Sequence, residues 1–338
     1  MPRASFRQKR LLVLRRQLFE PHGIRHGPRL AVMHVRTTWP IVRTVEVGVL
    51  HPGEMGASIA STLVRAGNHV LWFPEGRSAE TTQRAAAAGM EAVASLDEMV
   101  VRCEIIVSIC PPDAALGVAR QVATTARRFG GIYLDANAIS PATAEAVSSL
   151  LTADGARYLD GGVIGAPPRQ GRHSTRLYLS GPDASAVAEQ FSSPELDVFA
   201  LGGSHTAASA LKMAYAAWTK GTAALILAVR ATAEHYGVGE NLVGEWARSI
   251  PALIDQSDRA AVSAMTKGWR WTGEMEEIAA TFRGADIPEG FGMAAAEVFR
   301  RVPRQEPHGD VTDLYTVLGD LTGEAPSRRV AAAPECGP

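Results

Sequence analysis

The sequence predicts an α/β domain with a doubly wound parallel sheet, followed by an all-α domain. From residue 45 to about residue 203, short apolar runs alternate with helical segments of roughly 10–15 residues, which is the pattern of right-handed βαβ units. From residue 204 onward only helical periodicity is found. The 32 glycines and 6% aromatic residues also favour tight strand-to-helix turns over a β-sandwich.

The elements of the first domain follow from apolar runs and the turn residues between them. The expected strands cover 45–50, 69–73, 91–93, 104–109, 131–135 and 157–160. The expected helices cover 57–66, 78–88, 96–102, 113–128 and 141–151. The strand at 104–109 is apolar on both faces, so we expect it inside a sheet that is covered on both sides.

The second domain begins with a long helix from Thr206 to about Tyr236, roughly 45 Å at the usual rise per residue. Its own residues are small or apolar on every face, which is typical of a helix buried in a core or an interface. Shorter helices are expected at 240–248, 257–266, 273–282 and 290–302. Because the long helix is too apolar for a monomer surface, we expect a homodimer that shares the helical domain.

Charge is unevenly distributed along the chain. Residues 1–44 carry ten Lys/Arg and one acid, which leaves 24 of the 34 basic and 34 of the 35 acidic residues for 45–338. This acidic body excludes a nucleic-acid-binding domain. The basic arm 1–44 contains several helix breakers and is predicted to be a disordered extension without a catalytic role; targeting and weak anion binding stay open.

The remaining boundaries and the compartment follow from composition. We expect a cofactor-binding domain at 45–203, a helical domain at 204–320 and a disordered tail at 321–338. No segment reaches the roughly 18 uncharged apolar residues of a membrane helix. Three cysteines without a C-x-x-C pair indicate neither a disulfide framework nor a zinc knuckle, so a cytoplasmic protein is expected.

A candidate pyrophosphate-binding turn lies between the first strand and the first helix. Gly53 would let the backbone approach the phosphates, Gly56 would let the helix pack closely on the strand, and the helix N-terminus would hold the anion. His51 stands where the first glycine of G-x-G-x-x-G belongs, so an ordinary strand-to-helix turn is the alternative. The candidate cofactor residues of this turn are Gly48, His51, Pro52, Gly53, Glu54, Met55 and Gly56.

This turn resembles that of the β-hydroxyacid dehydrogenase and 6-phosphogluconate dehydrogenase superfamily, whose members carry G-x-x-G-x-G-x-M-G. The resemblance extends over about 45–320 and includes the segments 108–113 and 135–141. Residues 269–278 resemble the small C-terminal domain of one uncharacterised branch. The resemblance implies a Rossmann domain that binds a nicotinamide cofactor, followed by a helical substrate domain.

The residues that follow the second strand favour NADP over NAD as the cofactor. Where an acid usually holds the ribose 2′-hydroxyl in NAD-binding proteins, the chain has Pro74 followed by Arg77 and Ser78. Arg77 can pair with a 2′-phosphate, and Ser78 can add a hydrogen bond. Glu75 keeps NAD possible, and a solvated Arg77 is the other alternative.

The loops after two central strands lie where ligands bind in doubly wound sheets. By resemblance, Cys110, Pro111 and Pro112 flank the nicotinamide and its ribose, and Asn137 approaches the nicotinamide edge. The alternatives are a small buried hydrophobic residue for Cys110 and a local turn cap for Asn137.

Lys212 is the first charged residue within the long apolar helix. Burial should therefore lower its pKa toward the working pH, where a lysine can both donate and accept a proton. Tyr215, Thr219 and Lys220 follow at i+3, i+7 and i+8, which suggests one polar substrate wall. By resemblance, Lys212 matches the superfamily's catalytic lysine, and Tyr215 is a candidate second acid. A snorkelling lysine is the alternative.

The chain also departs from the superfamily pattern. Hydroxyacid enzymes carry Asn one turn beyond the lysine, where this chain has Tyr215 and Ala216, and Ile164 replaces the serine of the substrate loop. Backbone N–H groups around Gly161, Gly162 and Gly165 are expected to form an anion nest there.

A cluster of three acids, Glu274, Glu276 and Glu277, would face the cleft or a cation, or else lie on a solvated surface. The histidine spacing in the folded part matches no metal motif, so no catalytic metal is expected.

The expected function is NADP-dependent hydride transfer to or from a small anionic hydroxy or oxo substrate. Reduction of a C=N bond and non-catalytic sensing of NADP are the alternatives. No partner other than the small-molecule substrate and a second copy of the chain is expected.

Overall fold

The computed structural model describes residues 43–125, 128–304 and 313–323. The predicted extension 1–44 lies outside the described residues except for its last two positions, as does the predicted tail except for 321–323.

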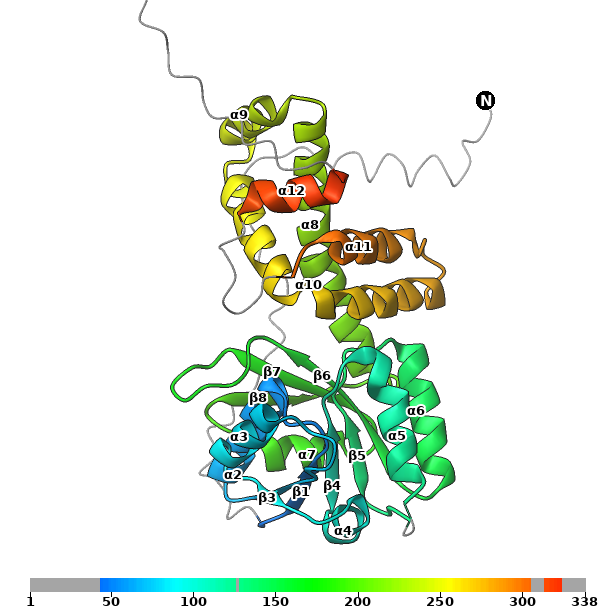
Figure 1. The fold of residues 1–338 in the computed structure, drawn as a ribbon. Helices are drawn as coiled ribbons and strands as arrows, with labels where there is room; N and C mark the ends of the chain where they lie inside the picture. Colours follow the sequence, from blue (N-terminus) through cyan, green and yellow to red (C-terminus); the bar gives the residue numbers. More distant parts are fainter. Residues whose placement is uncertain (1–42, 126–127, 305–312, 324–338) are drawn as a thin grey trace, which may run out of the picture. The chain divides into compact units, whose positions relative to one another are not determined.

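An eight-stranded sheet forms the first half of the described chain (Figure 1). The strands are β1 (Glu46–Val49), β2 (His69–Trp72), β3 (Glu91–Ala92), β4 (Ile105–Ser108), β5 (Ile132–Asp135), β6 (Arg157–Ile164), β7 (Thr175–Ser180) and β8 (Leu196–Ala200). Their order is β3-β2-β1-β4-β5-β6-β7-β8, and all neighbours are parallel except β6 and β7. The predicted parallel sheet is confirmed for β1 to β6, whereas β7 and β8 are strands that the sequence analysis did not predict.

Six helices accompany the sheet, together with a short 3₁₀ helix at Pro112–Ala114. They are α2 (Glu54–Arg65), α3 (Ala79–Ala87), α4 (Leu96–Arg102), α5 (Ala115–Ala123), α6 (Pro141–Ala153) and α7 (Ala184–Phe191). Serine side chains cap α3, α4 and α6, since the hydroxyls of Ser78, Ser95 and Ser140 each accept a hydrogen bond from a backbone N–H three residues later.

The sheet is covered on both faces, as predicted for a doubly wound domain. One core cluster joins α2, α3 and α7 to the sheet, and a second joins α4, α5 and α6. Alternate residues of β4 enter the two clusters: Ile105 and Val107 contribute to the first, and Ile106 contributes to the second. The prediction that this strand lies inside a sheet covered on both faces, made from its apolar residues, is therefore confirmed.

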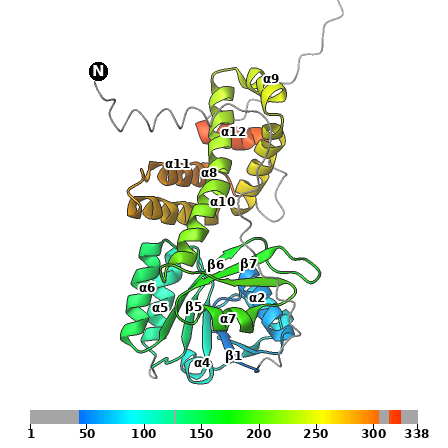
Figure 2. The ribbon, with the colours of Figure 1, turned by 180° about the vertical axis from the view of Figure 1, so that it is seen from behind.

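The second half contains helices only (Figures 1 and 2). They are α8 (Ala207–His235), α9 (Gly239–Ser249), α10 (Ala252–Gly284), α11 (Gly290–Arg301) and α12 (Leu314–Thr322). These helices pack around a third core cluster. None of the helices in the described ranges is long and apolar enough to cross a membrane.

Two predictions for this half are corrected. The helices expected at 257–266 and 273–282 are one continuous helix of 33 residues, α10. The intervening Gly268 is buried and does not break the helix. The tail expected from residue 321 starts later, since α12 continues to Thr322 and is closed by Gly323 in the left-handed region.

Candidate functional site

The turn between β1 and α2 has the properties of an anion-binding helix start. Gly53 is the N-cap of α2, and no side chain caps its first turn. A Cβ atom added to Gly53 would meet nothing within 4 Å, so the backbone there is open to a ligand. A Cβ on Gly56 would lie 2.3 Å from the carbonyl oxygen of His51, so this close approach requires glycine. Both glycines therefore fit the pyrophosphate turn.

The other residues of this turn have structural surroundings of their own. A Cβ on Gly48 would lie 2.8 Å from the sulfur of Met99, so glycine at this position allows α4 to pack closely on β1. Pro52 is buried, Met55 packs against the first core cluster, and Glu54 is exposed in the first turn of α2.

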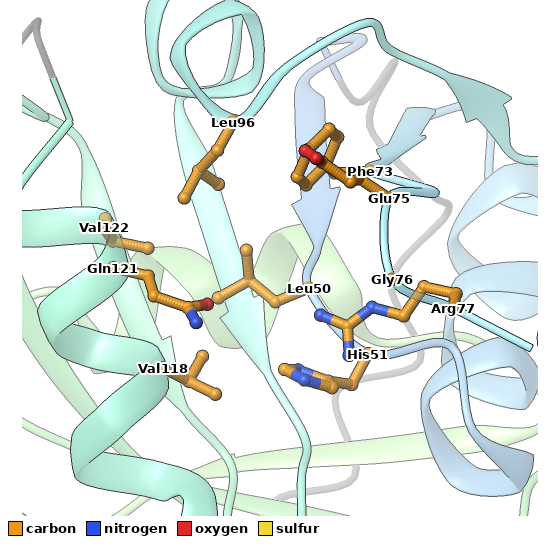
Figure 3. A pocket seen from close by; sticks show the side chains of 10 residues that line it. All are labelled: Leu50, His51, Phe73, Glu75, Gly76, Arg77, Leu96, Val118, Gln121 and Val122. Carbon is orange, nitrogen blue, oxygen red and sulfur yellow. The ribbon is translucent and has the colours of Figure 1, made fainter.

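A cavity of about 380 Å³ opens beside this turn (Figure 3). It is lined by Leu50, His51, Phe73, Glu75, Gly76, Arg77, Leu96, Val118, Gln121 and Val122. Figure 3 shows the imidazole of His51 and the guanidinium of Arg77 close together at one end, with Leu96, Val118 and Val122 around the rest. A mainly apolar cavity with a few converging polar groups is typical of a small-molecule site.

The two basic groups of the cavity lack partners. His51 Nδ1 and Arg77 Nε are buried without a hydrogen bond. Burial, reinforced by the charge of Arg77, lowers the pKa of His51 to about 4, and burial lowers the pKa of Arg77. Ser78 instead caps α3, and exposed Glu75 lines the same cavity.

Asn137 connects the loops that follow β4 and β5. Its side-chain oxygen accepts the N–H of Cys110 at 2.6 Å, and its side-chain nitrogen donates to the hydroxyl of Ser108 at 3.1 Å. Asn137 therefore fixes the loop that carries Cys110, Pro111 and Pro112. Burial raises the pKa of the Cys110 thiol to about 12, which agrees with a small buried residue rather than a nucleophile.

A buried polar row crosses the sheet at the carboxyl ends of β4 and β5, the middle of β6 and the carboxyl end of β7. Strand register places Ser108 beside Asp135, Asp135 beside Asp160, and Asp160 beside Ser180 of β7. All four residues are at most 1% exposed. Burial raises the pKa of Asp135 to about 7, and the backbone N–H of Asn137 partly opposes this.

The polar row holds the start of α8. The carboxylate of Asp160 accepts hydrogen bonds from the Ser209 N–H at 2.8 Å, the Ser209 hydroxyl at 2.5 Å and the Ser180 hydroxyl at 3.0 Å. The Ser180 hydroxyl accepts the N–H of Ala208 at 2.9 Å. Two side chains of the sheet thus cap a helix that has no cap of its own. No pattern in the sequence had predicted that Asp160 and Ser180 bind the first turn of α8.

Lys212 lies one turn beyond that anchor. A Cβ on Gly162 of β6 would be 3.1 Å from Lys212 Cβ, so glycine allows the lysine stem to pack on the strand. Within the described part of the chain, the ammonium makes no hydrogen bond or ion pair. Burial lowers the pKa of Lys212 to about 8, as its apolar surroundings in the sequence predicted.

The single polar wall expected on α8 is not formed. Tyr215 is 46% exposed, and the hydroxyl of exposed Thr219 donates to the Tyr215 carbonyl oxygen at 3.2 Å. Lys220 pairs with Glu274 of α10. Burial lowers the pKa of Lys220, and the nearby ammonium groups of Lys212 and Lys267 lower it further.

The expected anion nest is also corrected. β6 continues through Ile164, so Gly161 and Gly162 belong to an extended strand paired with β7. Ile164 is buried, and Gly165 has φ +117° with a Cβ position only 2.0 Å from the Ser174 carbonyl oxygen. These glycines serve close packing, because an extended strand does not form the concave backbone of a nest.

The three clustered acids of α10 have three different partners. Glu274 pairs with Lys220, and exposed Glu276 pairs with Arg300. Glu277 accepts the Ser140 N–H at 2.6 Å and the Thr143 hydroxyl at 2.8 Å, so it caps α6 from the helical half. The solvated surface that was one alternative for this cluster is therefore correct only for Glu276. No group of three metal-ligating side chains occurs in the residues that the structure describes.

Comparison with known proteins bears on both halves of the chain. Residues 46–190 match the NAD binding domain of 6-phosphogluconate dehydrogenase, and residues 233–302 match a domain of unknown function, DUF1932. An uncharacterised 28.5 kDa protein of Methanothermus fervidus is 26% identical over 201 residues, which are 59% of this chain and 75% of that protein. L-threonate dehydrogenase of Cupriavidus necator is 29% identical over 172 residues, which are 49% of this chain and 57% of that enzyme.

A solved structure extends the likeness to the whole fold. A conserved protein of unknown function, described as structurally similar to 3-hydroxyacid dehydrogenases, matches with a TM-score of 0.57 and 26% identity. The match covers 76% of this chain and 96% of that protein. The chain therefore combines an NAD-binding domain like that of 6-phosphogluconate dehydrogenase with a DUF1932 domain, and its fold resembles that of 3-hydroxyacid dehydrogenases, which supports an NAD(P)-dependent oxidoreductase.

Proposed function

We propose that this protein is an NADP-dependent oxidoreductase that acts on a small anionic hydroxy or oxo compound. The observation that carries the proposal is the buried, unpartnered ammonium of Lys212, one turn beyond an anchor at the carboxyl edge of the sheet. Ligands of doubly wound sheets bind at this edge. A buried lysine without a counter-ion is costly to keep for packing alone, which favours a functional role.

The turn at Gly53 and the cavity beside it fit the cofactor. The open N-terminus of α2 would hold the pyrophosphate, the apolar cavity walls would receive the adenine, and Arg77 would pair with a 2′-phosphate. The loop from Cys110 to Pro112, fixed by Asn137, would flank the nicotinamide. When bound, the nicotinamide supplies hydride chemistry at its C4 atom.

Lys212 would supply the matching proton chemistry. During oxidation, the neutral amine accepts the proton of the substrate hydroxyl while the carbon-bound hydrogen leaves as hydride and the C=O bond forms. During reduction, the ammonium returns the proton to the oxygen. At pH 7 the free ammonium also favours an anionic substrate. Asp160 and Ser180 keep Lys212 in place through the first turn of α8.

We further propose that the functional unit is a homodimer formed through α8. Leu211, Tyr215, Trp218, Leu225 and Val229 are spaced by three, four or seven residues, which places them on one side of the helix, and they are 37–73% exposed. They form one apolar stripe along a helix that lies in front of α11 and α12 in Figure 2. A stripe of this length is typical of a helix that packs against another chain. Tyr215 belongs to this stripe, so a role as second acid would require the partner to enclose it.

The proposal is tested with the full chain in a spectrophotometric assay. Hydroxy acids, oxo acids and cyclic imines are offered with the oxidised or reduced forms of NADP and NAD, for wild type and Lys212→Ala. Turnover of hydroxy or oxo acids that prefers NADP and requires Lys212 supports the proposal. Turnover of imines alone would overturn the substrate class. Tight NADPH binding without turnover of any substrate would instead favour the alternative that the protein is a non-catalytic sensor of NADP.

A further inference from the structure

His51 occupies a position where a dinucleotide-binding turn normally has a glycine without a side chain. The turn itself forms without that glycine, since the Gly53 N–H donates to the His51 carbonyl oxygen at 2.8 Å. The imidazole is directed into the cavity beside the turn (Figure 3). Histidine therefore adds a polar group at a place where the fold does not need one.

The end of the cavity that holds His51 has basic groups and no anion. His51 Nδ1 and Arg77 Nε are both buried without a hydrogen-bond partner. Glu75 lines the same cavity, but it is exposed and makes no ion pair with Arg77 among the described residues. Two buried, unsatisfied nitrogen groups side by side destabilise the free protein, and an anionic ligand between them would remove that cost.

We propose that His51 and Arg77 together bind the phosphate on the ribose 2′-position of NADP, so that His51 is a second determinant of cofactor preference. This inference rests on the proposed function. β1 and β2 are neighbours, and the two residues follow their carboxyl ends, two positions after Val49 and five after Trp72. With the pyrophosphate at the N-terminus of α2, the ribose 2′-position faces the end of β2.

The chemistry of the two side chains matches a phosphate. The guanidinium of Arg77 offers a planar set of N–H donors, and the Nδ1-protonated tautomer of the neutral imidazole offers one N–H toward the same end of the cavity. A phosphate has three acceptor oxygens and can take hydrogen bonds from both groups at once. A ribose 2′-hydroxyl has a single oxygen and no charge, so His51 should discriminate between the two cofactors.

The test uses fragments that lack the nicotinamide, so its readout is independent of activity. Isothermal titration calorimetry compares 2′,5′-ADP with ordinary 5′-ADP for wild type, His51→Phe and His51→Asn. Phe keeps the ring volume but removes the nitrogen atoms, whereas Asn keeps a donor near the Nδ1 position. Gln121→Ala is the matched control, because Gln121 lines the cavity away from the basic pair.

We expect wild type to prefer 2′,5′-ADP, and His51→Phe to reduce that preference by about 10-fold or more, the scale of one hydrogen bond to a charged group. His51→Asn should retain most of the preference, and Gln121→Ala should weaken both ligands equally. An unchanged preference in His51→Phe, together with a reduced one in Arg77→Ala, would overturn the role of His51 but leave NADP binding intact. If wild type shows no preference for the 2′-phosphate, the proposed cofactor itself is wrong.

Discussion

Replacing Lys212 with methionine separates the cost of burying this lysine from its use in catalysis. The pKa of Lys212 is about 8 in the folded protein and 10.5 in a solvated lysine. At about 1.4 kcal/mol for each pH unit, keeping the ammonium charged in the fold costs about 3 kcal/mol. Methionine has a similar length and no charge, so Lys212→Met should raise the free energy of unfolding at pH 7 by up to that amount.

The sign of the pH dependence follows from proton binding. Below pH 8 the lysine is protonated in both the folded and unfolded states, so the full cost is present. Between pH 8 and 10.5 the folded state has released the proton and the unfolded state still holds it, so wild-type stability rises with pH. The advantage of Lys212→Met should therefore be largest at pH 7 and should shrink between pH 8 and 10.5.

Urea denaturation of both proteins at several pH values measures this difference, with Lys267→Met as the control at an exposed lysine. Turnover should fall about 100-fold or more in Lys212→Met, which is the usual contribution of a positioned acid or base. In wild type, oxidation should accelerate about 10-fold from pH 7 to 9 as the neutral amine fraction rises. A variant that is more stable and equally active would refute the catalytic role, and a variant without a stability gain would refute the burial argument.

Four further changes test other parts of the structure. Arg77→Ala should weaken NADPH binding by roughly 1–3 kcal/mol and leave the affinity for NADH nearly unchanged, as measured by fluorescence titration. Equal losses of affinity for both cofactors would show that Arg77 does not bind the 2′-phosphate. Glu277→Ala should lower the free energy of unfolding by about 1–3 kcal/mol, because it leaves the Ser140 N–H without its partner; an unchanged melting curve would contradict this. Trp218→Glu should convert a dimer into a monomer, as measured by light scattering. A monomeric wild type would refute the proposal that the apolar stripe of α8 is a dimer interface. Tyr215→Phe should reduce turnover less than Lys212→Ala, unless the phenol is itself the acid.

Much of the fold could be predicted because its signals are local. Apolar runs and glycine turns gave the order of β1, β2, β4 and β5 and the helices between them. The antiparallel β7 was missed, since strand direction depends on where the chain returns and leaves no periodic signal. The single helix α10 was predicted as two shorter helices, whereas it continues through the intervening residues without a break.

The site was predictable only where one residue carried the signal. The lowered pKa of Lys212 could be predicted because the residue is a charge in an apolar helix, although its contact with Gly162 of β6 could not. Glu274 and Glu277 could not be assigned, since each residue on a helix is rotated by about 100° from the last and meets a different neighbour. Their partners Lys220 and Ser140 are 54 and 137 residues away in the chain. Such contacts depend on the packing of α10 against the rest of the protein.

The distribution of buried polar groups links the sheet to the proposed chemistry. Polar side chains in a core cost free energy unless they are bonded, and β4 and β5 are otherwise lined by apolar residues and Tyr133. Asp135, Asp160 and Ser180 nevertheless share one row, and it lies at the edge where doubly wound sheets bind ligands. Asp160 uses its bonds to fix the first turn of α8, and Lys212 is the next residue of that helix to reach the sheet. The row therefore supports the first turn of α8 and, with it, the lysine for which we propose a catalytic role.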